Sequence, residues 1–172
     1  AIHPDHGPAE RIVIHADAAM YAAKAMGRNT YAVFESSMGN AAQEQMSLQS
    51  DLKNAVAKGQ MELHYQPKMN GALAKFSGVE ALLRWNHPER GQISPALFIP
   101  LAERFGLIGS LGDWIIHEAC RQMAEWAQAG TNMRVAINVS AHQLRDPRLV
   151  QKIETTLQQH GVSPSRLLCE IT

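Results

Sequence analysis

The sequence predicts an α/β fold in which helices pack outside a parallel sheet. From Met61 onward the expected elements follow the order strand, strand, helices, strand, helix, strand, and such alternation is typical of parallel sheets. Three of the strands each interrupt an apolar run with one oxygen-bearing side chain, namely Glu80, Asn138 and Glu170. If such strands close into a barrel, one face of each points inward and active sites lie at the carboxyl ends of the strands.

Composition and charge exclude several other classes of protein. Of the 172 residues 45% are hydrophobic, which is enough for a real core. The chain carries 16 Lys and Arg against 16 Asp and Glu, so no basic surplus suggests binding to DNA or RNA polymers. No apolar run approaches the length of a membrane span, and we expect no membrane contact by this segment. Cys120 and Cys169 lie far apart in apolar segments, which predicts buried, reduced thiols in a cytoplasmic protein.

The first part of the chain predicts one helix and one short strand. The segment from Ile12 to Met26 is rich in alanine and is followed by Gly27, a natural stop signal. Residues 31–34 have the composition of a short strand. Since the sequence starts at Ala1 rather than Met, and ends inside an apolar run, we expect both ends to be cuts in a longer protein.

Residues 39–57 are predicted to form a linker that leads into a second domain. Gly39-Asn40 interrupts the helical pattern, after which apolar residues recur at roughly helical spacing. Ser50 is a suitable helix start and Gly59 a suitable end.

An antiparallel hairpin is expected next. Residues 61–68 alternate between apolar and polar side chains and are closed by Pro67, and Asn70-Gly71 is a turn signal. Its partner is the strand at residues 78–85, in which Glu80 and Arg84 share one face. A carboxylate in a buried strand is costly unless it is paired or binds a metal, so a Glu80–Arg84 ion pair and a metal site are both open readings here.

The remaining elements complete the alternation. Ser94-Pro95 starts a helix that Gly106 ends. A second helix, over residues 111–129, buries one stripe of side chains, made up of Trp114, Ile115, Ala119, Met123 and Trp126. A strand over residues 134–140 is followed by a helix with Leu149, Val150, Ile153 and Leu157 inward, and by a last strand over residues 167–172.

The three strands place two carboxylates and one amide oxygen at equivalent positions. These are hard oxygen ligands, which suit Mg²⁺, Mn²⁺ or Ca²⁺ rather than a structural zinc ion. A satisfied buried polar network is the alternative explanation of the same pattern.

Five segments together resemble the EAL domain, in the order and spacing of that family. They are Glu62–Lys68, Gly78–Trp85, Ser94–Glu103, Ala136–Ser140 and Cys169–Thr172. The resemblance implies a modified TIM barrel whose first strand is antiparallel, and hydrolysis of cyclic di-GMP to linear pGpG with divalent metals. Residues 58–172 would be the N-terminal portion of such a domain, and therefore an incomplete, half barrel.

The resemblance also implies roles for individual residues. Glu80, Asn138 and Glu170 match metal ligands, for Mg²⁺ or Mn²⁺ with Ca²⁺ as a non-productive substitute. Gln66 matches a contact to a guanine and Arg84 a contact to a phosphate of cyclic di-GMP. In the parent protein the domain is expected to form a homodimer.

Residues 16–29 resemble the closing segment of the GGDEF (diguanylate cyclase) domain. Residues 1–38 would then be the C-terminal remnant of that α/β domain, with Lys24 and Arg28 as contacts to a triphosphate. A solvated basic helix end is the alternative for these two side chains.

The family's later motifs, an Asp-Asp pair and a Lys, are expected beyond Thr172. We therefore predict a phosphodiesterase that acts in bacterial second-messenger signalling, of which residues 1–172 alone are inactive and poorly soluble unless they dimerise. A cytoplasmic location is expected. Whether the parent protein carries an upstream sensor or membrane domain is left open. The alternatives are a catalytically inactive cyclic di-GMP receptor and a regulatory or dimerisation module.

Overall fold

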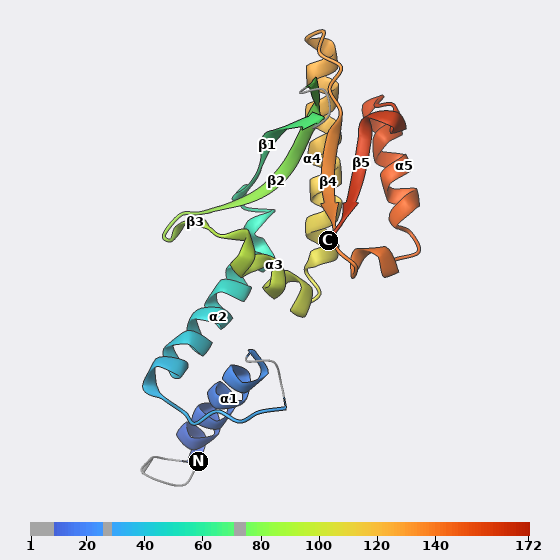
Figure 1. Cartoon of the computed structure of the whole chain (residues 1–172). Helices are drawn as coiled ribbons and strands as arrows, with labels where there is room; N and C mark the ends of the chain where they lie inside the picture. The colour runs from blue at the N-terminus through green and yellow to red at the C-terminus, as the bar shows by residue number, and fades with distance from the viewer. Residues whose placement is uncertain (1–8, 26–28, 71–74) are drawn as a thin grey trace. The chain divides into compact units, whose positions relative to one another are not determined.

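The computed structural model describes residues 9–25, 29–70 and 75–172 (Figure 1). Backbone contacts divide the chain into two compact units, Ala1–Asp51 and Leu52–Thr172. The elements in chain order are α1 (Ala9–Ala25), α2 (Ser36–Ala55), β1 (Met61–Asn70), β2 (Lys75–His87), β3 (Gly91–Ile93), α3 (Pro95–Arg104), α4 (Ile108–Gln128), β4 (Val135–Val139), the 3₁₀ turn η1 (Gln143–Arg145), α5 (Leu149–His160), the 3₁₀ turn η2 (Pro164–Arg166) and β5 (Leu167–Ile171).

In the first unit the expected helix is present as α1, but the strand predicted at residues 31–34 is wrong. That segment has no regular secondary structure. Tyr31 is 84% exposed and Val33 is 72% exposed. A strand depends on a neighbour for its backbone hydrogen bonds, and the described residues offer none at this place. Phe34 instead stacks on the ring of His15, with centroids 3.8 Å apart.

The linker is one continuous helix, so the predicted interruption at Gly39-Asn40 and the start near Ser50 are both wrong. α2 begins at Ser36 and runs through both residues. One internal glycine costs a helix only about 1 kcal/mol, which good helix formers on either side can offset. The predicted end is correct, since the helix stops after Ala55 and Gly59 takes a positive φ of 64°.

The second unit holds a mixed sheet with the strand order β1-β2-β4-β5, and β3 pairs with β2. β1 and β2 are antiparallel, as predicted, whereas β2, β4 and β5 are parallel to one another. Pro67 does not close β1. It pairs with Val79 inside the strand, which is tolerated because β1 lies at the end of the strand order and needs fewer ladder hydrogen bonds. The turn predicted at Asn70-Gly71 extends outside the described residues.

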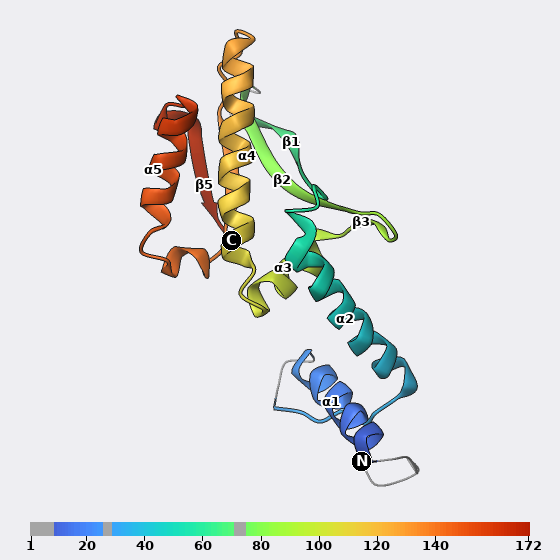
Figure 2. The same cartoon turned by 180° about the vertical axis from the view of Figure 1, so that it is seen from behind.

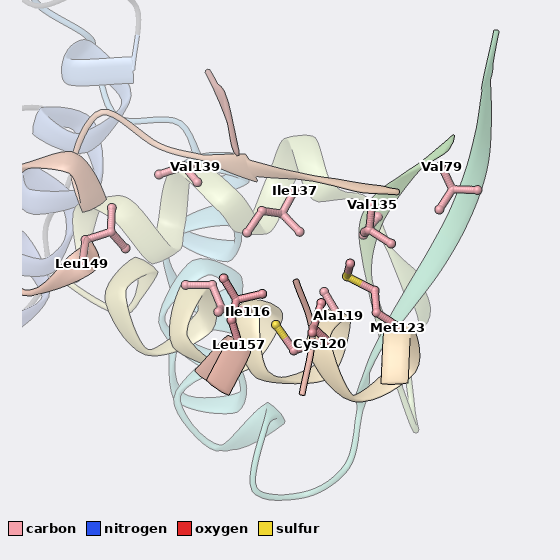
Figure 3. Close-up of a cluster of buried hydrophobic side chains, with 12 residues drawn as sticks. Val79, Ile116, Ala119, Cys120, Met123, Val135, Ile137, Val139, Leu149 and Leu157 are labelled. Atoms are coloured by element: carbon pink, nitrogen blue, oxygen red, sulfur yellow. The ribbon is translucent and has the colours of Figure 1, made fainter. Parts of the chain in front are cut away.

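The helices cover one face of this sheet, which confirms the predicted α/β class. α4 runs along β4 in both views (Figures 1 and 2). Figure 3 shows the strand side chains that point at the helix residues beneath them. The buried cluster includes Val79, Ala81, Val135, Ile137 and Val139 from the strands and Ile116, Ala119, Cys120 and Met123 from α4.

Three further expectations meet different outcomes in this core. Trp126 packs edge-on against Tyr65 with ring centroids 4.8 Å apart, so it is a packing residue as predicted. Val150 is 66% exposed, and its predicted inward position is wrong because Leu149 and Leu157 alone carry the fully buried stripe of α5. Cys169 is exposed rather than buried, since β5 has a neighbouring strand on one side only.

Candidate active site

The polar side chains gather on the face of the sheet opposite the helices. Side chains alternate along a strand, so the positions next to the core residues of β2, β4 and β5 point the other way. Gln66 pairs with Glu80 across β1 and β2, and Asn138 pairs with Glu170 across β4 and β5. Glu80 lies level with Ala136, two residues before Asn138 on the same strand. The structure therefore brings Glu80, Asn138 and Glu170 together from three neighbouring strands.

Two contacts connect these side chains. The Asn138 Nδ2 atom donates a hydrogen bond of 2.8 Å to Glu80 Oε1. The Lys68 ammonium group forms an ion pair with Glu170 Oε1. Lys68 is a residue that the sequence prediction missed, although its spacing of two from Gln66 places both on the same strand face. The four side chains form one partly buried polar group.

Arg84 does not pair with Glu80. Its Nη1 atom donates to the Leu83 carbonyl oxygen at 2.9 Å, and none of the ion pairs among the described residues joins it to Glu80. Arg84 and Asn138 both line a pocket of about 420 Å³, together with Leu82, Ser140, Gln143 and Thr172 among others. The Glu80–Arg84 ion pair, one of the two readings of the sequence, is therefore not formed. Arg84 instead lines a pocket that Asn138 also lines.

Glu62 and His64 form a second polar pair on β1, which was not predicted from the sequence. Glu62 lies opposite Arg84, and its Oε1 atom is 2.7 Å from His64 Nε2. A hydrogen bond from Asn86, and then one from His64, lowers the pKa of Glu62. The pair extends the polar face toward the end of β2 that carries Arg84.

The donor set fits a divalent cation in kind but not in number. Within the described parts of the chain, no three His, Cys, Asp or Glu side chains come together as a metal site would need. Glu80, Asn138 and Glu170 supply two carboxylates and one amide oxygen, which are ligands for hard cations. Mg²⁺ takes six oxygen ligands, so these three side chains would supply only part of its coordination shell.

The two predicted triphosphate contacts have no described geometry. Lys24 lies in α1, and its side chain is not described. Arg28 lies outside the described residues. No helix among the described residues is long and apolar enough to cross a bilayer.

A comparison with known protein families identifies the family to which the second unit belongs. The family model named "EAL domain" matches residues 49–172. The chain belongs to the EAL domain family. This confirms the resemblance of the strand motifs, and it places the polar face inside the matched region.

Curated relatives and solved structures agree with that assignment. The chain is 47% identical over its whole length to the bifunctional diguanylate cyclase/cyclic di-GMP phosphodiesterase MucR of Pseudomonas aeruginosa. Over 92% of its length it is 42% identical to the cyclic di-GMP phosphodiesterase PdeR of Escherichia coli. It spans 25% and 24% of these two proteins, about a quarter of each.

Two solved structures have a similar fold over about three quarters of this chain. A structure of PaMucR phosphodiesterase in complex with c-di-GMP aligns with a TM-score of 0.68 and 44% identity, over 72% of this chain and 50% of that one. The EAL domain of Xanthomonas citri FimX, also in complex with c-diGMP, aligns with a TM-score of 0.67 and 26% identity, over 77% and 51%. The mixed sheet described above is therefore the sheet of an EAL domain.

Proposed function

We propose that the full-length protein hydrolyses cyclic di-GMP to linear pGpG with a bound divalent metal, as part of bacterial second-messenger signalling. The observation that carries this proposal is the convergence of Glu80, Asn138 and Glu170 on one face of β2, β4 and β5. Support also comes from relatives at 42–47% identity whose names state cyclic di-GMP phosphodiesterase activity.

In this proposal the three oxygen-bearing side chains hold Mg²⁺ or Mn²⁺. The bound metal would supply an activated water and would offset negative charge on the phosphoryl oxygens. Arg84 lines the same pocket as Asn138, which supports a role for its guanidinium in holding a phosphate through paired N–H donors. Gln66 lies opposite Glu80 and offers an amide that can hydrogen-bond a guanine edge.

The proposal extends to the organisation of the whole protein. Residues 1–38 are proposed to be the end of a GGDEF domain, 39–57 a connecting helix and 58–172 the first part of the EAL domain. The match to MucR, whose name includes a diguanylate cyclase, covers the whole chain and supports this division. Lys24 and Arg28 stay predictions, as do a homodimer formed through the EAL domain and a cytoplasmic location.

The test measures hydrolysis of cyclic di-GMP to pGpG by chromatography, using the full-length protein with Mg²⁺ or Mn²⁺. Removing partners outside the ligand shell costs a metal enzyme about 10–100-fold, so Glu80→Gln, which removes a proposed ligand, should cost at least about 100-fold. Glu125→Gln is the matched control, because Glu125 lies on α4 and pairs with Arg121 on the helical side. Full activity in Glu80→Gln would contradict the proposed ligand.

Binding of cyclic di-GMP without hydrolysis is the outcome expected of a receptor. The alignment with a FimX EAL domain in complex with c-diGMP is the observation that favours this second function. Calorimetry with cyclic di-GMP and Ca²⁺ on the full-length protein, run beside the hydrolysis assay, separates the two.

A further inference from the structure

The ion pair between Lys68 and Glu170 joins the two ends of the sheet. Lys68 lies on β1 and Glu170 on β5, the first and last strands in the order β1-β2-β4-β5. The two residues are 102 positions apart in the chain, and each side chain is 36% exposed. The contact therefore lies on the polar face of the sheet, whose two middle strands carry Glu80 and Asn138.

The ammonium group sits among the proposed metal ligands. Lys68 pairs with Glu170, which lies opposite Asn138 across β4 and β5, and Lys68 is two residues from Gln66, which lies opposite Glu80. Glu80 accepts from Asn138, whose amide is neutral. Among the described residues, Lys68 is thus a cationic group that contacts one of the two proposed carboxylate ligands.

A divalent cation at this site would bind the same carboxylate group. Glu170 Oε1 is the oxygen that accepts from Lys68. A cation bound by Glu170 and Glu80 would also lie close to the positive charge of the ammonium group and be repelled by it. Metal binding and the Lys68–Glu170 contact therefore compete.

We propose that Lys68 is a positioning residue that holds the Glu170 carboxylate, and that a divalent cation competes with it for this carboxylate, so that the charge of Lys68 lowers metal affinity. This inference rests on the proposed function, because it takes Glu80 and Glu170 as metal ligands. It concerns the affinity of the site rather than the reaction.

The experiment measures Mn²⁺ affinity of the full-length protein without substrate, by electron paramagnetic resonance of free Mn²⁺. Lys68→Met should bind Mn²⁺ about fivefold more tightly, the change expected when one partly exposed ion pair no longer competes. Lys68→Arg keeps the positive charge and should stay near the original affinity. Lys152→Met is the matched control, since Lys152 is 33% exposed and pairs with Asp113 away from the polar face.

Glu170→Gln separates failure of this inference from failure of the proposed function. If Glu170→Gln weakens Mn²⁺ binding while Lys68→Met leaves it unchanged or weaker, the role of Lys68 is overturned and the ligand assignment stands. Equal tightening in Lys68→Met and Lys68→Arg would also overturn it, because charge would not be the cause. If Glu170→Gln has no effect, the ligand assignment fails, and the inference fails with it. Circular dichroism of each variant confirms that the comparison is between folded proteins.

Discussion

At the scale of single residues, Tyr65 shows a polar atom that the core does not use. Its hydroxyl oxygen is buried without a hydrogen-bond partner among the described residues, while its ring packs against Trp126. Burial also raises the pKa of this hydroxyl, because the charged form is disfavoured away from water. An unsatisfied buried hydroxyl costs free energy, whereas the ring contributes apolar contact.

We predict that Tyr65→Phe leaves the free energy of unfolding unchanged or raises it by up to about 1 kcal/mol. Tyr65→Leu should lower it, since the edge-on contact with Trp126 is lost, at about 0.5–1.5 kcal/mol beyond the buried area. Urea denaturation of the three proteins gives the comparison. A loss of stability in Tyr65→Phe as large as that in Tyr65→Leu would show that the hydroxyl has a partner.

Asp146 gives a prediction about pH. Its carboxylate accepts from the Arg148 backbone N–H at 3.0 Å and pairs with the Arg148 and Lys152 side chains. These contacts lower its pKa from 3.8 to about 2, the backbone hydrogen bond first. Because the pKa is lower in the folded state, Asp146 stabilises the fold above about pH 4, and this contribution is lost as the pH falls toward 2.

Asp146→Asn should therefore be less stable than the unchanged protein at pH 5, and the two stabilities should converge as the pH falls from about 4 to 2. Urea denaturation at pH 5, 4 and 3 follows the difference. A gap that stays constant over this range would mean that Asp146 acts through its shape rather than its charge.

At the scale of elements, Gly112 fixes how α4 meets the segment after β4. A Cβ atom at Gly112 would lie 1.8 Å from Gln143 Nε2. Gln143 is buried, and its Oε1 atom accepts from the Ser140 backbone N–H at 3.0 Å. Moving Gln143 would leave that buried N–H without its partner, and so disturb the chain just beyond Asn138.

Gly112→Ala is predicted to lower the free energy of unfolding by about 1–3 kcal/mol, the usual cost of overpacking a filled core. Gly109→Ala is a control on the same helix, because a Cβ atom there would meet nothing within 4 Å. It should be neutral or stabilising by up to about 1 kcal/mol, since alanine favours helices. Thermal unfolding measures the stability of both variants. An equal loss of stability in the two would contradict the close approach of Gln143 to Gly112.

At this scale, periodicity in the sequence predicts the face of a strand well, but it predicts very short strands and helix faces poorly. Apolar alternation placed Glu80 and Glu170 on strand faces, because a period of two determines the face whatever the partner strand is. β3 was missed because three residues carry no usable periodicity. Val150 was misplaced because several helix faces fit a short apolar pattern, and only the packing of Leu149 and Leu157 selects one.

At the scale of the whole molecule, the register in which neighbouring strands pair could not be predicted from the sequence. The pairing of Gln66 with Glu80, and of Asn138 with Glu170, follows from how the strands align, which no single segment encodes. The contact of Lys68 with Glu170 depends on the order of four strands. The strand face of each proposed ligand was therefore predictable, whereas its neighbours on adjacent strands were not.

The number of donors leads to a prediction about the whole site. Residues 1–172 place three proposed ligands on the polar face, two carboxylates and one amide, while Mg²⁺ and Mn²⁺ favour six oxygen ligands. We predict that residues 1–172 alone bind Mn²⁺ at least about tenfold more weakly than the full-length protein and do not hydrolyse cyclic di-GMP, because removing supporting groups from a metal site costs about 10–100-fold. Glu170→Gln in both proteins tests whether the same ligand acts in each. Equal Mn²⁺ affinity in the two proteins, or metal-dependent cleavage by residues 1–172, would show that the three side chains suffice.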